Sequence, residues 1–240
     1  MDLNKINNLI VDIADVNKFS MVSKPLFQTV VRNYYNINSL EGDIIECGVW
    51  KGGYSVFLSH LFNNKKIWVC DSFGDSAFQS IKDAKYKKLT YYNEVQGKMT
   101  ERFQKGDNMG MSVSLNNVKW VFNKYGLENN PRINFVEGFV NKTLPTLNID
   151  KIALLRIDVD GYSPTREVLD HLYDKVVPGG MIIFDDLCLV ESAEATKDWL
   201  FEKGLPLEVR DPYDDKIYSL KNRIVDSESG FHTGSYIIKK

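Results

Sequence analysis

The segment between residues 152 and 187 constrains the fold of this chain most strongly. It contains two short apolar runs, and each run ends in a pair of carboxylates. The pairs are Asp158 with Asp160, after the run 152–157, and Asp185 with Asp186, after the run 181–184. A short apolar run followed by polar residues is typical of a buried parallel strand that ends at the edge of a sheet. The segment therefore predicts two neighbouring parallel strands in an α/β fold.

Open α/β sheets bind ligands in the crevice outside the carboxyl ends of their strands. Four carboxylates in one crevice would repel one another, so we expect a positive charge among them. A hard divalent cation is the simplest candidate, because such ions prefer oxygen ligands. For any single aspartate the alternative is structural: Asp158 could pair with Arg156, and Asp185 and Asp186 could cap the next loop and helix.

A strand, a glycine-rich loop and a helix are predicted between residues 44 and 61. The loop holds Gly48, Gly52 and Gly53, which would let a ligand approach the backbone near the free N–H groups of the helix start. The spacing Glu-x-Gly-x-x-x-Gly differs from the Gly-x-Gly-x-x-Gly of dinucleotide enzymes. A tight turn without a ligand would also favour glycine here.

Asp71 ends a second predicted strand, 66–71. An acidic side chain at this place can accept hydrogen bonds from both hydroxyls of a ribose. The alternative is a helix cap or a solvated loop acid. After Asp71, residues 72 to about 112 interrupt the alternation of predicted strands and helices. A long connection of this kind favours a lid or a disordered segment.

Strands and helices alternate from residue 44 to 203, which predicts a doubly wound, mostly parallel sheet. Candidate final strands are 207–209 and 235–238. Residues 1–40 predict a helical layer for packing or dimerisation, because Ile6, Ile10 and Ile13 recur at helical spacing. We therefore expect this layer followed by one domain, 41–240, that carries the insertion.

The formal charge of −2 argues against a broad nucleic-acid footprint. The sequence predicts no membrane span, because no apolar stretch approaches the length of a membrane helix. Its start lacks the pattern of a signal peptide, and its three cysteines lack zinc-ligand spacing. A reducing cytoplasm is the favoured location.

Several stretches together resemble a known family. They are GDIIECGVWKGG, WVCDSF, KYGL, the region around EGFVNKTLP, RIDVDGYSPT, LYDKVVPGG and FDD, and they cover roughly residues 41 to 190. The chain resembles the class I S-adenosylmethionine (SAM) methyltransferases of the macrocin O-methyltransferase type, which methylate sugar hydroxyls on antibiotics. The resemblance implies a Rossmann-like sheet, SAM and Mg²⁺ as cofactors, a sugar or glycoside acceptor, and a dimer or larger homo-oligomer.

The resemblance also implies roles for particular residues. It places Mg²⁺ on Asp158, Asp185 and Asp186 and makes Asp160 the general base. The implied SAM-binding residues are Glu46, Gly48 and Gly52 in the loop, Asp71 and Ser72 after the second strand, and Gly138 and Phe139 near the adenine. If the extended geometry persists through Val159, strand alternation would put Asp158 and Asp160 on one side.

One departure from the family lies after Tyr162, where members usually carry an acidic residue and this chain has Ser163 and Pro164. Two other functions stay open from the residues alone. One is an oxidoreductase with a nucleotide cofactor, which Asp71 fits and the glycine spacing does not. The other is a non-catalytic module that keeps a SAM-binding fold.

Overall fold

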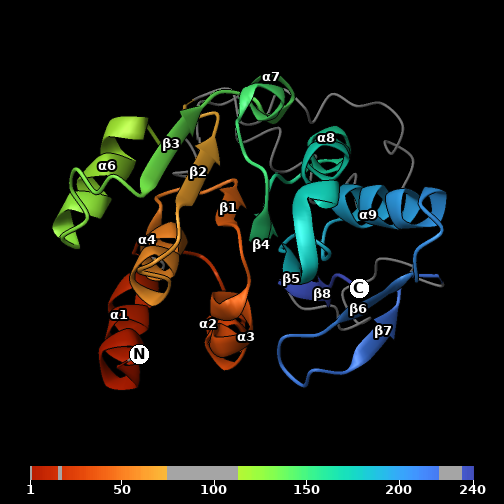
Figure 1. The fold of residues 1–240 in the computed structure, drawn as a ribbon, viewed down its shortest axis with the longest axis horizontal. Helices are drawn as coiled ribbons and strands as arrows, with labels where there is room; N and C mark the ends of the chain where they lie inside the picture. Colours follow the sequence, from red (N-terminus) through yellow and green to blue (C-terminus); the bar gives the residue numbers. More distant parts are fainter. Residues whose placement is uncertain (1, 16–17, 75–112, 222–233) are drawn as a thin grey trace, which may run out of the picture.

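A computed structural model of the chain describes residues 2–15, 18–74, 113–221 and 234–240. Most of the expected insertion at 72–112 therefore lies outside the described residues. In the described part, eight strands form one sheet in the order β3-β2-β1-β4-β5-β8-β6-β7 (Figure 1). The strands are β1 Asp43–Cys47, β2 Ile67–Asp71, β3 Ile133–Glu137, β4 Ile152–Ile157, β5 Val176–Phe184, β6 Glu208–Arg210, β7 Ile217–Ser219 and β8 Ser235–Ile238.

The predicted doubly wound, mostly parallel sheet is confirmed. The first five strands of that order pair in parallel, and β8, β6 and β7 add an antiparallel edge. The sequence did not predict β7. Its three residues are all exposed, so the strand has no buried apolar face that a sequence pattern could indicate. β5 begins five residues before the predicted 181–184, because the chain stays extended through Pro178 and two glycines.

Helices cover both faces of the sheet, and the strands bury both faces accordingly. One core holds Ile44, Val69 and Leu154 against the helices of the first half, and the other holds Ile45, Leu155 and Ile182 against those of the second half. The helices are α1 Leu3–Ala14, α2 Lys24–Arg32, α3 Tyr34–Ser39, α4 Gly53–Leu61, α6 Leu115–Lys124, α7 Val140–Thr143, α8 Tyr162–Leu172 and α9 Val190–Glu202, with short 3₁₀ turns η4 Leu144–Thr146 and η5 Tyr173–Lys175. None of these helices is both long enough and apolar enough to cross a membrane.

The N-terminal helices pack on the same core as α4 and α6. Asp2 caps α1 by accepting hydrogen bonds from the Asn4 and Lys5 amides, and the three predicted isoleucines of α1 are buried. The chain then reaches the start of α4, where the Gly53 amide donates to the Phe19 carbonyl oxygen (2.9 Å). This contact brings the segment just after Phe19 to the carboxyl end of the sheet.

The carboxyl ends of β1, β2, β4 and β5 are joined by a row of backbone hydrogen bonds. The donors and acceptors are Gly48 N to Cys70 O (2.8 Å), Asp158 N to Cys47 O (2.8 Å) and Asp185 N to Ile157 O (2.9 Å). Gly48 has φ 84°, and a Cβ atom there would lie 1.6 Å from the Asp158 carbonyl oxygen. Only glycine fits at this contact between the loop after β1 and the end of β4.

We predict that Gly48→Ala destabilises the protein far more than Gly126→Ala. Gly126 also has a positive φ, 72°, but a Cβ there would meet nothing within 4 Å, so its substitution tests backbone strain alone. We expect about 1–2 kcal/mol for Gly126→Ala and at least about 3 kcal/mol for Gly48→Ala, which adds a backbone clash. Urea unfolding of both variants measures the difference, and equal losses would show that the close approach at Gly48 is unimportant.

Candidate active site

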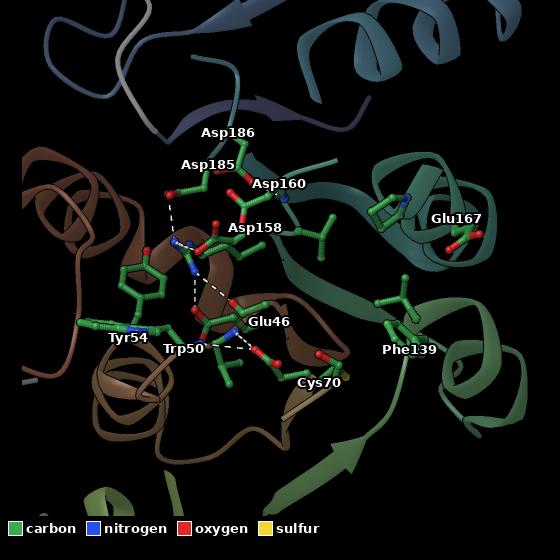
Figure 2. Close-up of a pocket in the computed structure, with 18 of the residues that line it drawn as sticks. Glu46, Trp50, Tyr54, Cys70, Phe139, Asp158, Asp160, Glu167, Asp185 and Asp186 are labelled. Carbon is green, nitrogen blue, oxygen red and sulfur yellow. Dashed lines mark hydrogen bonds and ion pairs between the residues drawn. The ribbon is translucent and has the colours of Figure 1, made fainter. Parts of the chain in front are cut away.

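A pocket of about 570 Å³ opens at the carboxyl ends of the parallel strands. Its lining comes from the loops after β1, β2, β3, β4 and β5 and from the N-terminal segment after Phe19 (Figure 2). Among the described residues, seven acidic side chains line it and two basic ones, Lys142 and Arg156. A pocket with this balance favours a cationic ligand.

Asp71 holds the glycine loop in place. Its Oδ2 atom accepts hydrogen bonds from the Val49 amide (2.7 Å) and the Trp50 amide (3.3 Å), and its Oδ1 atom accepts one from the Phe73 amide (3.0 Å). Trp50 and Phe73 both have positive φ values, 47° and 46°, so these bonds stabilise two strained turns. Asp71 lines the pocket as well. The sequence indicated the position of Asp71 but not this anchoring role.

Arg156 is the cationic centre of the site. It is 2% exposed, and β1 and β4 pair so that it lies directly opposite Glu46. Its Nη1 atom donates to Glu46, and its Nη2 atom lies 2.7 Å from Asp158 Oδ2 and 3.0 Å from Asp185 Oδ1. Arg156 therefore supplies part of the positive charge expected among the carboxylates, and its pairing with Asp158, the structural alternative, is present.

Glu46 lines the pocket, but both of its carboxylate oxygens have internal partners. One accepts from Arg156 and the other from the Ser55 hydroxyl. Burial raises the pKa of the Glu46 carboxyl, while Arg156 and the Ser55 hydrogen bond act in the opposite direction. Glu46 thus connects Arg156 to Ser55, which lies in α4 just after the glycine loop.

Asp158, Asp160 and Asp186 form a triad in which one carboxylate oxygen of each lies within 4.8 Å of the others. The Asp160 amide also donates to Asp186 Oδ2 (3.0 Å). The extended geometry assumed through Val159 is not observed: β4 ends at Ile157 and Asp160 has φ 57°. Asp158 and Asp160 converge because of this left-handed turn, and not because of strand alternation.

Burial is the main cause of a raised pKa for all three carboxyls of the triad, and neighbouring carboxylates add to it. The pKa of Asp160 is raised to about 6. Three oxygens this close, in groups that repel one another when ionised, are a suitable set of ligands for a hard divalent cation. The residues present therefore fit the predicted metal.

Asp185 is oriented differently from its neighbour Asp186. Both residues lie in the turn that follows the end of β5, and their carboxylates contact different partners. Asp185 joins Arg156, and Asp186 joins the triad. Of the three predicted metal ligands, the structure brings Asp158 and Asp186 together in the triad, whereas Asp185 contacts Arg156 and is not part of the triad.

The remaining predicted residues divide into two groups. Gly48, Ser72, Gly138 and Phe139 line the pocket, and Phe139 is 43% exposed. Gly52 does not: a Cβ there would lie 2.7 Å from a methyl carbon of Val118, so this glycine serves the packing of α4 against α6.

The structure also adds residues to the pocket that sequence reasoning missed. They are Ser20, Met21 and Val22 from the N-terminal layer, Asn141 and Lys142 from α7, and Glu167 from α8. The first three follow no motif and reach the pocket only because the N-terminal layer folds back on α4. Glu167 follows Ser163 by four residues, so both lie on the same face of a helix. This spacing was the only sequence signal for the position of Glu167.

The chain is similar to several known proteins. The family model described as Macrocin-O-methyltransferase (TylF) matches residues 18–212. Mycinamicin III 3''-O-methyltransferase of Micromonospora griseorubida is 30% identical over 182 residues, which are 72% of this chain and 65% of that protein. A tetracenomycin 4'-O-methyltransferase of Streptomyces olivaceus, named for its dimethoxy-rhamnosyl substrate, is 28% identical over 70% of this chain and 61% of its own length.

The chain thus spans slightly less than two thirds of the length of each of these relatives. The solved structure of the O-methyltransferase NovP superposes with a TM-score of 0.68 at 22% identity, over 99% of this chain and 98% of that one. That likeness shows the same fold. The family match covers most of the chain, including the glycine loop and all four aspartates, so this chain belongs to the macrocin O-methyltransferase (TylF) family.

Proposed function

We propose that this protein is a Mg²⁺- and SAM-dependent O-methyltransferase that acts on a hydroxyl of a sugar or glycoside. The observation that carries the proposal is the Asp158–Asp160–Asp186 triad, which lies in the same pocket as the glycine loop of a TylF-family chain. The sugar acceptor is supported by the names of the relatives, one of which refers to a rhamnosyl substrate. SAM would supply the methyl group from its sulfonium.

The metal ligands in this proposal are Asp158, Asp185 and Asp186. Asp158 and Asp185 each give one oxygen to Arg156, which leaves the other oxygen of each carboxylate for a metal. Arg156 would thus orient these carboxylates, as groups behind metal ligands commonly do. A magnesium ion held there would act as a Lewis acid on a substrate hydroxyl.

Asp160 is the proposed general base. An aliphatic hydroxyl holds its proton tightly, so a carboxylate must stand within hydrogen-bond distance of it to take that proton. The raised pKa of Asp160, about 6, makes it a stronger base than an ordinary aspartate while it is still ionised near neutral pH. The hydrogen bond from its own amide to Asp186 fixes the left-handed turn that points Asp160 toward the triad.

We predict that Asp160→Asn lowers the turnover number for methyl transfer by about 10²–10⁴-fold. The substitution keeps the shape of the side chain but removes its negative charge, and with it the ability to take up a proton from the substrate. The measurement is transfer of labelled methyl from SAM to a panel of glycosides with neighbouring hydroxyls. Calorimetry with S-adenosylhomocysteine is the control and should give unchanged affinity. Full turnover by the variant would exclude Asp160 as the base.

A second prediction separates metal ligands from the base. Asp158→Asn, Asp185→Asn and Asp186→Asn should each weaken Mn²⁺ binding by at least about 10-fold, while Asp160→Asn should weaken it less. Titration followed by electron paramagnetic resonance measures the four affinities under one buffer. If Asp160→Asn weakened Mn²⁺ binding more than Asp185→Asn did, the third metal ligand would be Asp160 and not Asp185. The three ligands would then be the residues of the triad.

A third prediction concerns pH and stability without metal. The folded-state pKa of Asp160, about 6, exceeds its ordinary value of 3.8, so the folded protein binds a proton that the unfolded chain releases. The stability gained this way is complete below about pH 4 and is lost as the pH rises through about 6. In chelator-treated protein, the melting temperature should therefore fall more steeply between about pH 4 and 7 than it does in Asp160→Asn.

Magnesium should restore the stability that the metal-free protein loses as the pH rises, because the carboxylates are then ionised. A ligand that binds only the folded state stabilises it, and protons compete for the same oxygens. We expect MgCl₂ to raise the melting temperature more at about pH 7.5 than at about pH 5, against NaCl of equal ionic strength. An identical response to both salts at about pH 7.5 would count against a metal site.

A further inference from the structure

Tyr54 presents a buried hydroxyl to the pocket. The residue is 2% exposed and lines the pocket, and its Oη atom has no hydrogen-bond partner among the described residues. Buried polar groups of folded proteins nearly always have a partner. A hydroxyl that lacks one and faces a binding pocket is therefore placed to bind a ligand.

Two further buried polar atoms without a hydrogen bond belong to residues beside Tyr54. They are Nε of Arg156 and Oδ1 of Asp185, the latter only in ion-pair contact with Arg156. The Arg156 guanidinium lies 4.7 Å from the centre of the Tyr54 ring. Figure 2 shows the Tyr54 hydroxyl directed toward the side of the pocket that holds Asp185 and the guanidinium. This corner offers an O–H donor, a cation and the carboxylates of Asp185 and Glu46, which together are complementary to a zwitterion.

The position of Tyr54 in the pocket indicates which zwitterionic group would bind in this corner. Tyr54 stands in the first turn of α4, directly after the glycine loop, and Phe139 lies on the opposite side of the pocket (Figure 2). SAM is elongated, with adenine at one end and an amino acid at the other. If its ribose lies by Asp71 and its adenine by Phe139, as expected from the sequence, the amino-acid end reaches the corner beside Tyr54. Ser20 and Met21 of the N-terminal layer line the same pocket.

We propose that Tyr54 is a further binding residue for the methyl donor, and that its hydroxyl donates a hydrogen bond to the carboxylate of the donor's amino-acid end. The inference rests on the proposed function, because it assumes that SAM is the donor. It assigns the fixed hydroxyl of Tyr54 to one part of that molecule only. The ring of Tyr54 has a separate role, since it packs against Phe27 and Phe57 (centroids 4.9 and 5.4 Å).

The test is Tyr54→Phe, which keeps this packing and removes only the hydroxyl. Two ligands are titrated by calorimetry in buffer with MgCl₂: S-adenosylhomocysteine and 5'-methylthioadenosine. Both are neutral thioethers of the same adenosine, but the second lacks the amino-acid group. We expect Tyr54→Phe to weaken binding of S-adenosylhomocysteine by about 10–150-fold, the usual effect of losing a hydrogen bond to a charged group. Its affinity for 5'-methylthioadenosine should not change.

Tyr125→Phe is the matched control. The Tyr125 hydroxyl donates to Asp12 Oδ2 (2.6 Å) and does not line the pocket, so its loss should leave both affinities unchanged. Unchanged S-adenosylhomocysteine binding by Tyr54→Phe, or an equal loss for both ligands, would overturn the inference and leave the proposed function standing. Failure of the unmodified protein to bind S-adenosylhomocysteine would overturn the proposed function and this inference with it. A melting temperature of Tyr54→Phe equal to or above that of the unmodified protein would show that the change is not an effect of unfolding.

Discussion

The guanidinium of Arg156 is the interaction on which the rest of the site depends. It lies inside β4 of a parallel sheet, where a charge without partners would be costly. Carboxylates on three strands compensate it: Glu46 at the end of β1, Asp158 just after β4 and Asp185 just after β5. Removal of one partner from a buried ion pair typically costs about 3–5 kcal/mol. The strand ends are therefore coupled, and a change in the glycine loop is felt by the acidic cluster.

The same arrangement explains why the four aspartates divide as they do. Asp158 and Asp185 pair with Arg156, whose guanidinium lies over the ring of Tyr54 in α4. Asp186 takes the other direction, and the left-handed turn at Asp160 brings that carboxylate to it. Asp158 belongs both to the carboxylates around Arg156 and to the triad, because one of its oxygens contacts Arg156 and its carboxylate is also part of the triad. It thus joins the proposed metal site to the donor side of the pocket.

Much of this architecture could be predicted from local patterns. The apolar runs predicted the central strands, and β4 was predicted to the residue. The position of Asp71 at a strand end was also readable. The use of Asp71 as an anchor for the Val49 and Trp50 amides was not, because it depends on how the loop after β1 meets the end of β2.

Other features depend on contacts between distant parts of the chain. Ser20 and Met21 line the pocket only because the Phe19 carbonyl oxygen accepts from Gly53, and no periodicity of residues 1–40 contains that information. The left-handed conformation of Asp160 is equally invisible, since an aspartate tolerates it without a sequence signal as clear as glycine. The different partners of Asp185 and Asp186 were not predicted either, because both residues lie in the turn after β5, where strand alternation does not fix the direction of a side chain.

The charge balance of the pocket bears on turnover. In the part of the chain that the structure describes, seven acidic and two basic side chains line it, and Arg156 is already shared among three of the acids. Such a pocket attracts a sulfonium cation more than the neutral thioether that remains after methyl transfer, because only the first carries the charge. On the proposed function, the acids that hold the metal also favour exchange of the spent donor for a fresh one. The amino-acid end is identical in both molecules, so the Tyr54 hydroxyl would hold them equally, and the discrimination between them would come from the carboxylates near the sulfur.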